Sequence, residues 1–120
     1  MKLSNCHNYN DFRKLAKKKL PSPIFHYIDG GSDDESTLNR NTDSFNDYDL
    51  IPSVLNDVSN IDMSTTVLGQ KIDFPLFPAA TAMHRLYHHE GEKASAKAVE
   101  NVGSNFGLST MSTVSIEEIA

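Results

Sequence analysis

The chain has 120 residues, of which 38% are hydrophobic and 22% are charged, a composition typical of a soluble globular protein rather than a disordered one. Its formal charge of −5 gives no general electrostatic reason to expect nucleic acid as a partner, and its only cysteine, Cys6, excludes an internal disulfide and a zinc site built from cysteines. The N-terminus lacks the apolar stretch of a secretory signal, and the most apolar region, 74–83, is short and contains two prolines, so no membrane-spanning segment is expected. A reducing compartment fits these features best.

The first part of the chain is predicted to be helical. Apolar residues at helical spacing predict a helix over 10–19 with Asn10 as its N-cap, and Pro21 ends it. A second short helix is predicted over 23–29, before two glycines that can cap its end. Ser32, followed by three acidic residues, reads as the N-cap of a third helix with acids in its first turn.

The second part of the chain is predicted to alternate between strands and helices. Two β-rich runs, 65–68 and 71–74, flank a glycine turn and predict a small hairpin. A buried strand over 76–80, a helix over 91–102 and a second strand over 106–109 are then expected. Roughly 30 residues separate these two strands, which is the length of a βαβ unit with a right-handed crossover.

The last residues of the chain predict the start of another helix. Ser115 and Glu118 form a capping-box pattern that opens a helix at Ile116, while the sequence ends at Ala120. Such a short helix has little to pack against, and two parallel strands alone leave both sheet edges open. We therefore expect the chain to be a fragment of a larger β/α architecture.

Several sequence strings, in order, resemble one enzyme family. LPSPIFHYIDGG at 20–31 and TLNRN at 37–41 are similar to the opening of the FMN-dependent 2-hydroxy-acid dehydrogenases and oxidases, which include glycolate oxidase, flavin-linked L-lactate dehydrogenases and mandelate dehydrogenase. Further strings keep the family's order and spacing over almost the whole chain: 57–59, 65–69, 75–83, 90–92 and 108–110.

The resemblance implies an α/β fold and FMN as the cofactor. Members form a (β/α)₈ TIM barrel preceded by a helical segment and a β-hairpin, and a whole barrel takes about 250 residues. On this basis 1–120 is an incomplete domain. Residues 1–74 correspond to the helical prelude and hairpin, and 75–120 to the first two barrel strands, one helix and the start of the next.

The activity that the resemblance implies is FMN-dependent oxidation of a small L-2-hydroxy acid to the 2-oxo acid. The string 25–31 is most similar to the lactate dehydrogenases, so L-lactate is the first candidate, followed by glycolate or a longer aliphatic acid. The family's base histidine and carboxylate-binding arginine lie on late strands, so no catalytic residue is assigned in this chain. The alternatives are an FMN barrel with different chemistry and a non-catalytic fragment or interaction module.

The resemblance also bears on partners and location. The electron acceptor is left open between oxygen, a quinone and a cytochrome, and a homo-oligomer is expected for the complete protein. The expected location is the cytoplasm, either free or peripheral to the inner membrane.

Four residues match positions that contact the flavin in the family. Ala80, Thr81 and Ala82 correspond to the strand-end segment that lies along the flavin ring, where small side chains let backbone groups approach. Ser109 corresponds to a second strand end that hydrogen-bonds the flavin. The alternatives are a tightly packed strand-to-loop turn for the first three residues and a local side-chain-to-backbone hydrogen bond for Ser109.

Two residues match positions near the substrate. Tyr27 corresponds to a phenol that donates a hydrogen bond to the substrate carboxylate; the alternative is an aromatic residue packed in the core. Met111 lies where some members carry a bulky aromatic residue that shortens the pocket and others an aliphatic one. A thioether fits an aliphatic substrate such as lactate, but it can equally fill a gap in the core.

A histidine-rich loop offers possible metal ligands. His84, His88, His89 and Glu90 carry imidazole and carboxylate groups, with the first two histidines four residues apart. The resemblance places these residues in the loop before a helix, no cysteine joins them, and the flavin reaction needs no metal. No metal site is therefore expected.

Overall fold

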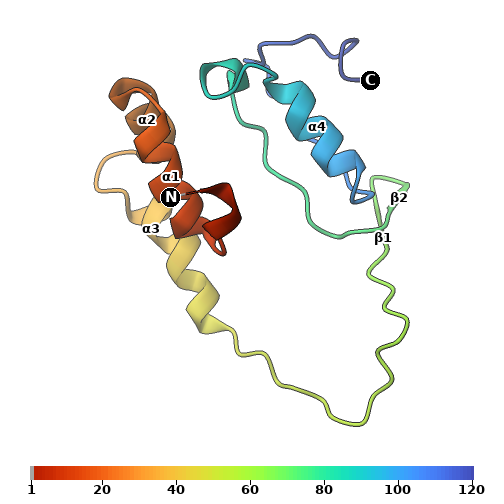
Figure 1. Ribbon diagram of the computed structural model, residues 1–120. Helices are drawn as coiled ribbons and strands as arrows, with labels where there is room; N and C mark the ends of the chain where they lie inside the picture. Colours follow the sequence, from red (N-terminus) through yellow and green to blue (C-terminus); the bar gives the residue numbers. More distant parts are fainter. Residues whose placement is uncertain (1) are drawn as a thin grey trace. The chain divides into compact units, whose positions relative to one another are not determined.

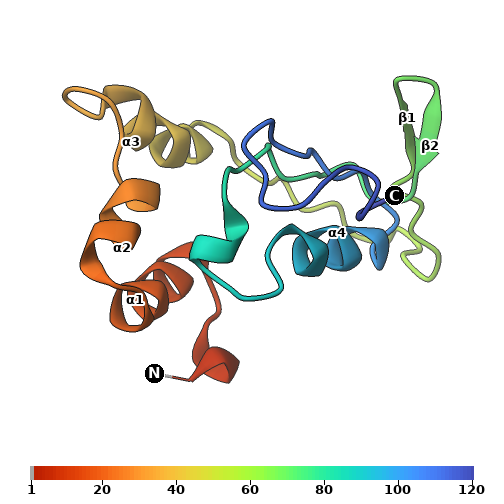
Figure 2. The ribbon, with the colours of Figure 1, turned by 90° about the horizontal axis from the view of Figure 1, so that it is seen from above.

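A computed structural model describes residues 2–120 and divides the chain into two units, which meet in the sequence between Leu55 and Asn56 (Figure 1, and turned in Figure 2). Among the described residues of the first unit are η1 (Leu3–Asn5), α1 (Tyr9–Lys19), α2 (Ser22–Asp29), α3 (Ser36–Asp43) and η2 (Ser44–Asp47), where η marks a 3-10 helix. The second unit contains β1 (Thr65–Val67), β2 (Gln70–Ile72), η3 (His84–Leu86) and α4 (Glu92–Glu100). Within residues 2–120, no helix combines the length and the apolar character needed to cross a bilayer.

The boundary between the units lies upstream of the hairpin. The sequence predicts a helical prelude and hairpin over 1–74 and barrel strands over 75–120, whereas the structure groups the hairpin with α4. The two units are defined by contacts between residues, whereas the predicted division separates residues that belong to the barrel from those that precede it. The two boundaries need not coincide. The predicted division therefore stays a prediction.

In the first unit, α1 and α2 contact each other and contribute one buried residue each, Leu15 and Phe25. The ammonium of Lys17 lies 5.9 Å from the centroid of the Phe25 ring. Arg13 on α1 donates two hydrogen bonds to Asp29 on α2, with an Nη2 to Oδ2 distance of 2.8 Å. The hydrogen bond from this guanidinium lowers the pKa of the Asp29 carboxyl. Together these contacts fix the orientation of α2 against α1.

The first helix begins earlier than predicted. Its N-cap is Asn8, whose side-chain oxygen accepts the backbone N–H of Asp11 at 3.0 Å, so the prediction of Asn10 as the cap is wrong. The carboxylate of Asp11 in turn accepts the N–H of His7 at 3.2 Å. These two hydrogen bonds satisfy the N–H groups of Asp11 and His7 at the helix start, which Asn10, inside the first turn, cannot do.

The third helix begins later than predicted. Its start is Ser36, not the residue after Ser32, because the Ser32 carbonyl accepts the Glu35 N–H at 2.9 Å and closes a turn. Glu35 adopts a left-handed backbone with φ 57°, and its carboxylate accepts the N–H of Gly31 at 3.0 Å. The acidic run therefore forms the connection between α2 and α3 rather than the first turn of a helix.

The predicted hairpin is confirmed. β1 and β2 pair antiparallel, with Thr65 opposite Ile72, and the pairing closes through a two-residue turn at Leu68 and Gly69. Both turn residues are left-handed, with φ of 51° and 82°, which matches the right-handed twist of the strands. The turn lies one residue earlier than predicted. Ile72 is buried at the end of β2 and anchors the hairpin in the second unit.

The two predicted barrel strands, 76–80 and 106–109, are not strands in the structure. The segments are nonetheless connected near both ends: the Asp73 N–H donates to the Gly103 carbonyl at 2.8 Å, and the Met83 N–H donates to the Met111 carbonyl at 3.0 Å. Pro75, just before the first segment, and Pro78, in its middle, lack the N–H that a ladder needs. The described residues thus combine helices with one two-stranded sheet and show no barrel.

The helix α4 is shorter than the predicted 91–102 and is flanked by two left-handed glycines, Gly91 with φ 59° and Gly103 with φ 65°. A Cβ atom on Gly103 would lie 2.8 Å from the Cβ of Asp73, so this position needs glycine for space as well as for its backbone angle. The turn after α4 brings Gly103 beside Asp73, the residue that follows β2.

The predicted capping box near the end of the chain is confirmed. The Ser115 N–H donates to the Glu118 carboxylate at 3.0 Å, and the Glu118 N–H donates to the Ser115 hydroxyl at 3.3 Å. Residues 117–119 form a turn rather than the predicted helix. Lys93 on α4 donates to the same carboxylate at 3.0 Å, so the turn is attached to the helix.

Candidate functional site

The predicted flavin-contact residues lie on two segments of the second unit that approach each other. We call residues 80–85 the first loop and residues 109–114 the second loop. The hydrogen bond from Met83 to Met111 joins them, and a Cβ built on Gly107, just before the second loop, would lie 3.4 Å from the N atom of Ala80. The structure therefore brings the predicted residues of both loops together.

The first loop offers unused backbone donors. Among the described residues, no hydrogen-bond partner is found for the N–H groups of Ala80, Thr81 and Ala82. Ala80 and Thr81 are exposed and Ala82 is half-buried, so these groups can meet a ligand. The Thr81 hydroxyl makes only a long contact of 3.4 Å with the Ala79 carbonyl. The choice between a flavin contact and a tightly packed turn for this segment stays a prediction.

In the second loop, the Ser109 hydroxyl has a donor that no described residue uses. The Ser109 Oγ accepts the N–H of Met111 at 3.1 Å, so the local hydrogen bond considered as an alternative is formed. Its O–H remains available as a donor, because a hydroxyl accepts and donates at the same time. The local bond and a ligand contact are therefore compatible at Ser109.

The two predicted substrate residues are both exposed. Tyr27 lies on α2 in the first unit and is 58% exposed, and Met111 lies in the second loop and is 56% exposed. Neither side chain fills a core gap in the unit that carries it. Met111 is thus grouped with the flavin-contact residues, whereas Tyr27 belongs to the other unit.

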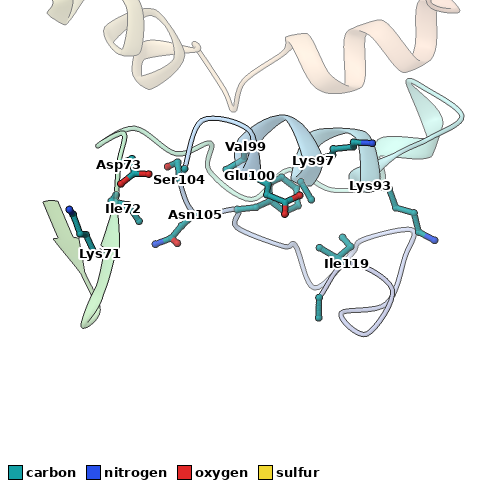
Figure 3. Close-up of a pocket in the computed structure, with 14 residues that line it drawn as sticks. Lys71, Ile72, Asp73, Lys93, Lys97, Val99, Glu100, Ser104, Asn105 and Ile119 are labelled. Atoms are coloured by element: carbon teal, nitrogen blue, oxygen red, sulfur yellow. The ribbon is translucent and has the colours of Figure 1, made fainter. Parts of the chain in front are cut away.

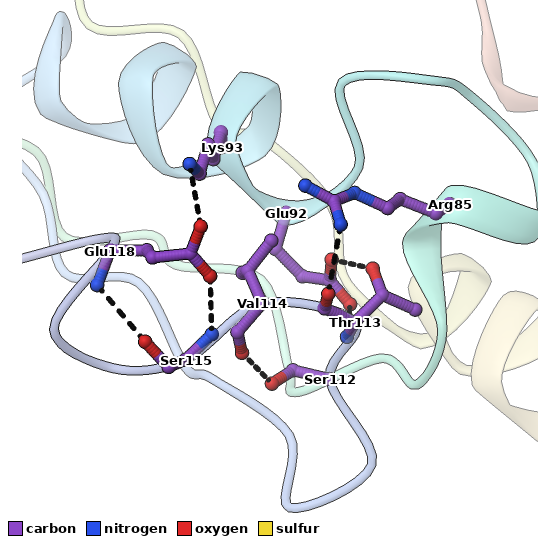
Figure 4. Close-up of polar contacts among 8 residues, drawn as sticks. All are labelled: Arg85, Glu92, Lys93, Ser112, Thr113, Val114, Ser115 and Glu118. Carbon is purple, nitrogen blue, oxygen red and sulfur yellow. Dashed lines mark hydrogen bonds and ion pairs between the residues drawn. The ribbon is translucent and has the colours of Figure 1, made fainter.

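A buried carboxylate that the sequence analysis missed connects the two loops (Figure 4). Glu92, at the start of α4, is completely buried and accepts the N–H of His84 at 3.1 Å and the N–H of Thr113 at 2.9 Å. It also accepts the Thr113 hydroxyl. Burial raises the pKa of Glu92, but the hydrogen bonds from Thr113 and His84 outweigh it and lower this pKa from 4.5 to about 2. The carboxylate is therefore ionised at neutral pH.

Arg85 completes the contacts around Thr113. Its guanidinium donates to the Thr113 carbonyl at 3.2 Å, so all three polar groups of Thr113 are hydrogen-bonded. Gly91 makes room for this arrangement, since a Cβ there would lie 2.7 Å from the Cγ of Arg85. We call Arg85, Glu92 and Thr113 the Thr113 clamp.

His84 is held firmly beside the clamp. Its Nδ1 lies 3.1 Å from the Ser95 hydroxyl on α4, and its ring makes an edge contact with Phe106 at 6.3 Å between centroids. Its Nε2 is buried and has no hydrogen-bond partner among the described residues. The ring is thus fixed by packing on one side and by one hydrogen bond on the other.

The histidine-rich loop forms an exposed group of possible metal ligands. Ligand atoms of His88, His89 and Glu90 lie within 4.8 Å of one another, and all three residues are exposed. The Nδ1 of His88 already accepts the Glu90 N–H at 3.3 Å, and His84 turns its own Nδ1 to Ser95 instead. The expectation that no metal binds here stays a prediction.

A cavity of about 730 Å³ lies between α4, the end of β2 and the chain after Gly103 (Figure 3). Charged and polar groups mix with apolar ones on its wall, including Asp73, Lys93, Glu100, Asn105 and Phe106. None of the predicted flavin or substrate residues lines it. The cavity is therefore separate from the two loops of the candidate site.

Two curated relatives illustrate what the chain is similar to. A peroxisomal (S)-2-hydroxyacid oxidase of Arabidopsis thaliana is 46% identical over 113 residues, which cover 94% of this chain and 31% of that oxidase. An L-lactate dehydrogenase of Vibrio parahaemolyticus is 44% identical over 110 residues, which cover 92% of this chain and 29% of that enzyme. The chain spans about a third of the length of these relatives.

Solved structures agree with the sequence comparison and support the α/β fold. A soluble mutant of the membrane-associated (S)-mandelate dehydrogenase from Pseudomonas putida matches with a TM-score of 0.86 and 36% identity, over 96% of this chain and 33% of that one. The family model described as FMN-dependent dehydrogenase matches residues 16–120. Because this match takes in most of the sequence, the chain belongs to the FMN-dependent dehydrogenase family.

Proposed function

We propose that the protein carrying this chain oxidises a small L-2-hydroxy acid to the 2-oxo acid with FMN as the electron acceptor, on a (β/α)₈ barrel to which the chain contributes the first strands. One observation carries the proposal beyond family membership. The two loops that approach each other in the structure expose unused donors at the positions that the family resemblance assigns to the flavin, 80–82 and Ser109.

The donor set of these loops suits a flavin. The isoalloxazine ring presents carbonyl oxygens and ring nitrogens along one edge, and these accept hydrogen bonds from backbone N–H groups and hydroxyls. The N–H groups of Thr81 and Ala82 and the hydroxyl of Ser109 are donors of this kind. Bound FMN supplies an acceptor for the hydride equivalent that leaves the α-carbon of the substrate.

The chain's own residues have two tasks in this proposal. The first is to hold the flavin edge, through the backbone of the first loop and Ser109. The second is to orient the substrate, through the Tyr27 phenol as a neutral donor to the carboxylate and through Met111 as an apolar wall. The proton acceptor is a histidine outside this chain, as the family resemblance implies.

L-lactate is the leading substrate within this class. The exposed thioether of Met111 offers an apolar, adaptable surface for a short aliphatic side chain. The string FHYIDGG at 25–31 is most similar to lactate dehydrogenases. Glycolate and longer aliphatic 2-hydroxy acids are the next candidates, because the same wall contacts them.

The partners and location of the complete protein are also proposals. We infer that the complete protein is a homo-oligomer, which is either free in the cytoplasm or peripherally associated with the inner membrane. The relatives differ in this respect, since one is peroxisomal and another is membrane-associated.

The test is to express the complete open reading frame, isolate the protein by gel filtration and record its flavin absorbance. L-lactate, D-lactate, glycolate and L-mandelate are then added without oxygen, and the rate of flavin bleaching is followed. We expect bound FMN and the highest kcat/KM with L-lactate. A colourless protein after incubation with FMN contradicts the proposal and favours a non-catalytic module. Bound FMN that no 2-hydroxy acid reduces favours an FMN barrel with different chemistry.

A further inference from the structure

We propose that Glu92 and Thr113 are positioning residues for the flavin site, which hold the two loops at a fixed separation so that residues 80–82 and Ser109 reach the cofactor together. The inference rests on the proposed function, because it assigns a task within that same site. Neither residue is expected to touch FMN or substrate.

Several hydrogen bonds converge on Thr113. Glu92 accepts the N–H and the O–H of Thr113, and Arg85 donates to the Thr113 carbonyl. Every polar group of Thr113 is therefore hydrogen-bonded within the protein. Glu92 also accepts the N–H of His84, which directly follows Met83 in the first loop. One carboxylate thus binds both loops at once, and neither loop can shift without breaking a hydrogen bond to a buried charge.

The surroundings of the Glu92 carboxylate hold it in place. Glu92 is completely buried, and the described residues place no cation within ion-pair distance of it. Its charge is balanced by neutral donors, which include the N–H and O–H of Thr113, the N–H of His84 and its own backbone N–H. A buried charge that loses one of a few neutral donors has no water to replace it, so the arrangement tolerates little displacement.

The position of Thr113 is coupled to that of Ser109 through the turn between them. The Ser112 N–H donates to the Ser109 carbonyl at 3.0 Å, and the Met111 N–H donates to the Ser109 hydroxyl at 3.1 Å. Residues 109–112 therefore form a turn closed by its own hydrogen bonds, which moves as one piece with the adjacent Thr113. Displacement of Thr113 then displaces the hydroxyl proposed to contact the flavin.

The experiment compares two substitutions at one position in the complete protein. Thr113→Val removes the hydroxyl but keeps the shape and the N–H, whereas Thr113→Ser keeps the hydroxyl. Glu117→Gln serves as a control, because it removes an exposed carboxylate of the same unit for which no hydrogen bond or ion pair is found among the described residues. Each variant is examined for hydrogen exchange of residues 109–112 without FMN, for FMN affinity, and for the rate of flavin reduction at saturating FMN and L-lactate.

We expect Thr113→Val to accelerate exchange of the 109–112 amides and to weaken FMN binding about tenfold, since one hydrogen bond to a charged group is lost. The rate of flavin reduction falls as well, although FMN is saturating. Thr113→Ser and Glu117→Gln are expected to stay within about twofold of the unaltered protein in all three measurements.

A purely structural role predicts a different pattern. Thr113→Val would then lower the melting temperature while FMN affinity and the reduction rate at saturation stay unchanged, and this result overturns the inference. If Thr113→Val does not fold, Glu92→Gln, which keeps the side-chain shape, is judged by the same three measurements. Failure of the proposed function looks different again, because the unaltered protein then binds no FMN or is not reduced by any 2-hydroxy acid.

Discussion

Tyr27 lies on α2 and is 58% exposed, and the family resemblance assigns its phenol to the substrate carboxylate. We predict that Tyr27→Phe in the complete protein keeps the FMN content and raises KM for L-lactate about tenfold. A hydrogen bond to a charged carboxylate contributes about 1.5–3 kcal/mol, and about 1.4 kcal/mol corresponds to a factor of ten. If the bond strengthens in the transition state, kcat falls too.

Tyr48 offers a matched control for this prediction. It is another tyrosine of the first unit and is 80% exposed, but the family resemblance gives it no role. Tyr48→Phe should leave the steady-state kinetics with L-lactate unchanged. Equal kcat/KM values for Tyr27→Phe and the unaltered protein would remove Tyr27 from the substrate site.

The buried Glu92 carboxylate predicts a specific pH dependence of stability. Its pKa is lowered from 4.5 to about 2 in the folded state, so ionisation stabilises the fold above pH 4.5 and this contribution is lost as the pH falls toward 2. We expect Glu92→Gln to lower the free energy of unfolding by about 1–3 kcal/mol at neutral pH, and by progressively less below pH 4.5. Urea unfolding across this pH range measures the difference.

Glu117→Gln is the corresponding control, because this carboxylate is exposed and makes no hydrogen bond in the described structure. Its free energy of unfolding should track that of the unaltered protein at every pH. A difference between Glu92→Gln and the unaltered protein that stays constant down to pH 2 would argue against ionisation as the source of stability.

The elements of the second unit depend on glycines in two different ways. Gly69 has φ 82° with nothing within 4 Å of a Cβ, whereas Gly103 has φ 65° and a Cβ there would overlap Asp73. We predict that Gly69→Ala lowers the free energy of unfolding by about 1–2 kcal/mol through backbone strain alone. Gly103→Ala should cost clearly more, because steric overlap adds to the same strain.

Denaturant unfolding of both glycine variants provides the measurement, and each serves as the control for the other. An equal loss at the two positions would show that the turn after α4 yields to make room for the methyl group. In that case the contact between Gly103 and Asp73 contributes little to the position of the segment after the helix.

Local signals in the sequence predicted the elements that local hydrogen bonds build. The capping box at Ser115 and Glu118 and the hairpin turn at Gly69 depend on residues within a few positions, and both are present. Helix starts depend on finer contacts: Asn8 and Asn10 are equally good caps by type, and the N–H of Asp11 donates to Asn8 while the Asp11 carboxylate accepts the N–H of His7. The prediction of strands at 76–80 and 106–109 is wrong for the described residues. Apolar side chains favour a buried position, but a strand also needs a neighbouring strand to pair with.

The candidate site was predictable only where family resemblance marks it. Positions 80–82 and Ser109 follow from matched strings, and the structure brings them near each other. Glu92 was missed, because an acid in the first turn of a helix normally indicates a favourable dipole contact at the surface. Its partner Thr113 is 21 residues away, and no periodicity connects the two.

At the scale of the whole molecule, we predict that the 120-residue chain alone neither retains FMN nor oxidises hydroxy acids. Phosphate sites of such barrels are built by late strands, and the chain spans about a third of the relatives' length. We also expect it to associate, because large apolar side chains are exposed along 48–63, among them Leu50, Ile51 and Leu55. Gel filtration with excess FMN tests both expectations, with the complete protein as the control. A yellow, monomeric chain with a sharp thermal transition would contradict them.

The Thr113 clamp also has a consequence for the order in which the protein acquires its structure. Its contacts join Thr113 to Arg85, 28 residues earlier, and to Glu92, 21 residues earlier. Closing these loops costs less entropy than pairing the first and last strands of a barrel of about 250 residues, so the clamp can close before the barrel does. During synthesis on the ribosome, the two loops can therefore be joined soon after Thr113 emerges. The flavin-facing edge would then serve as a template on which later parts of the protein assemble.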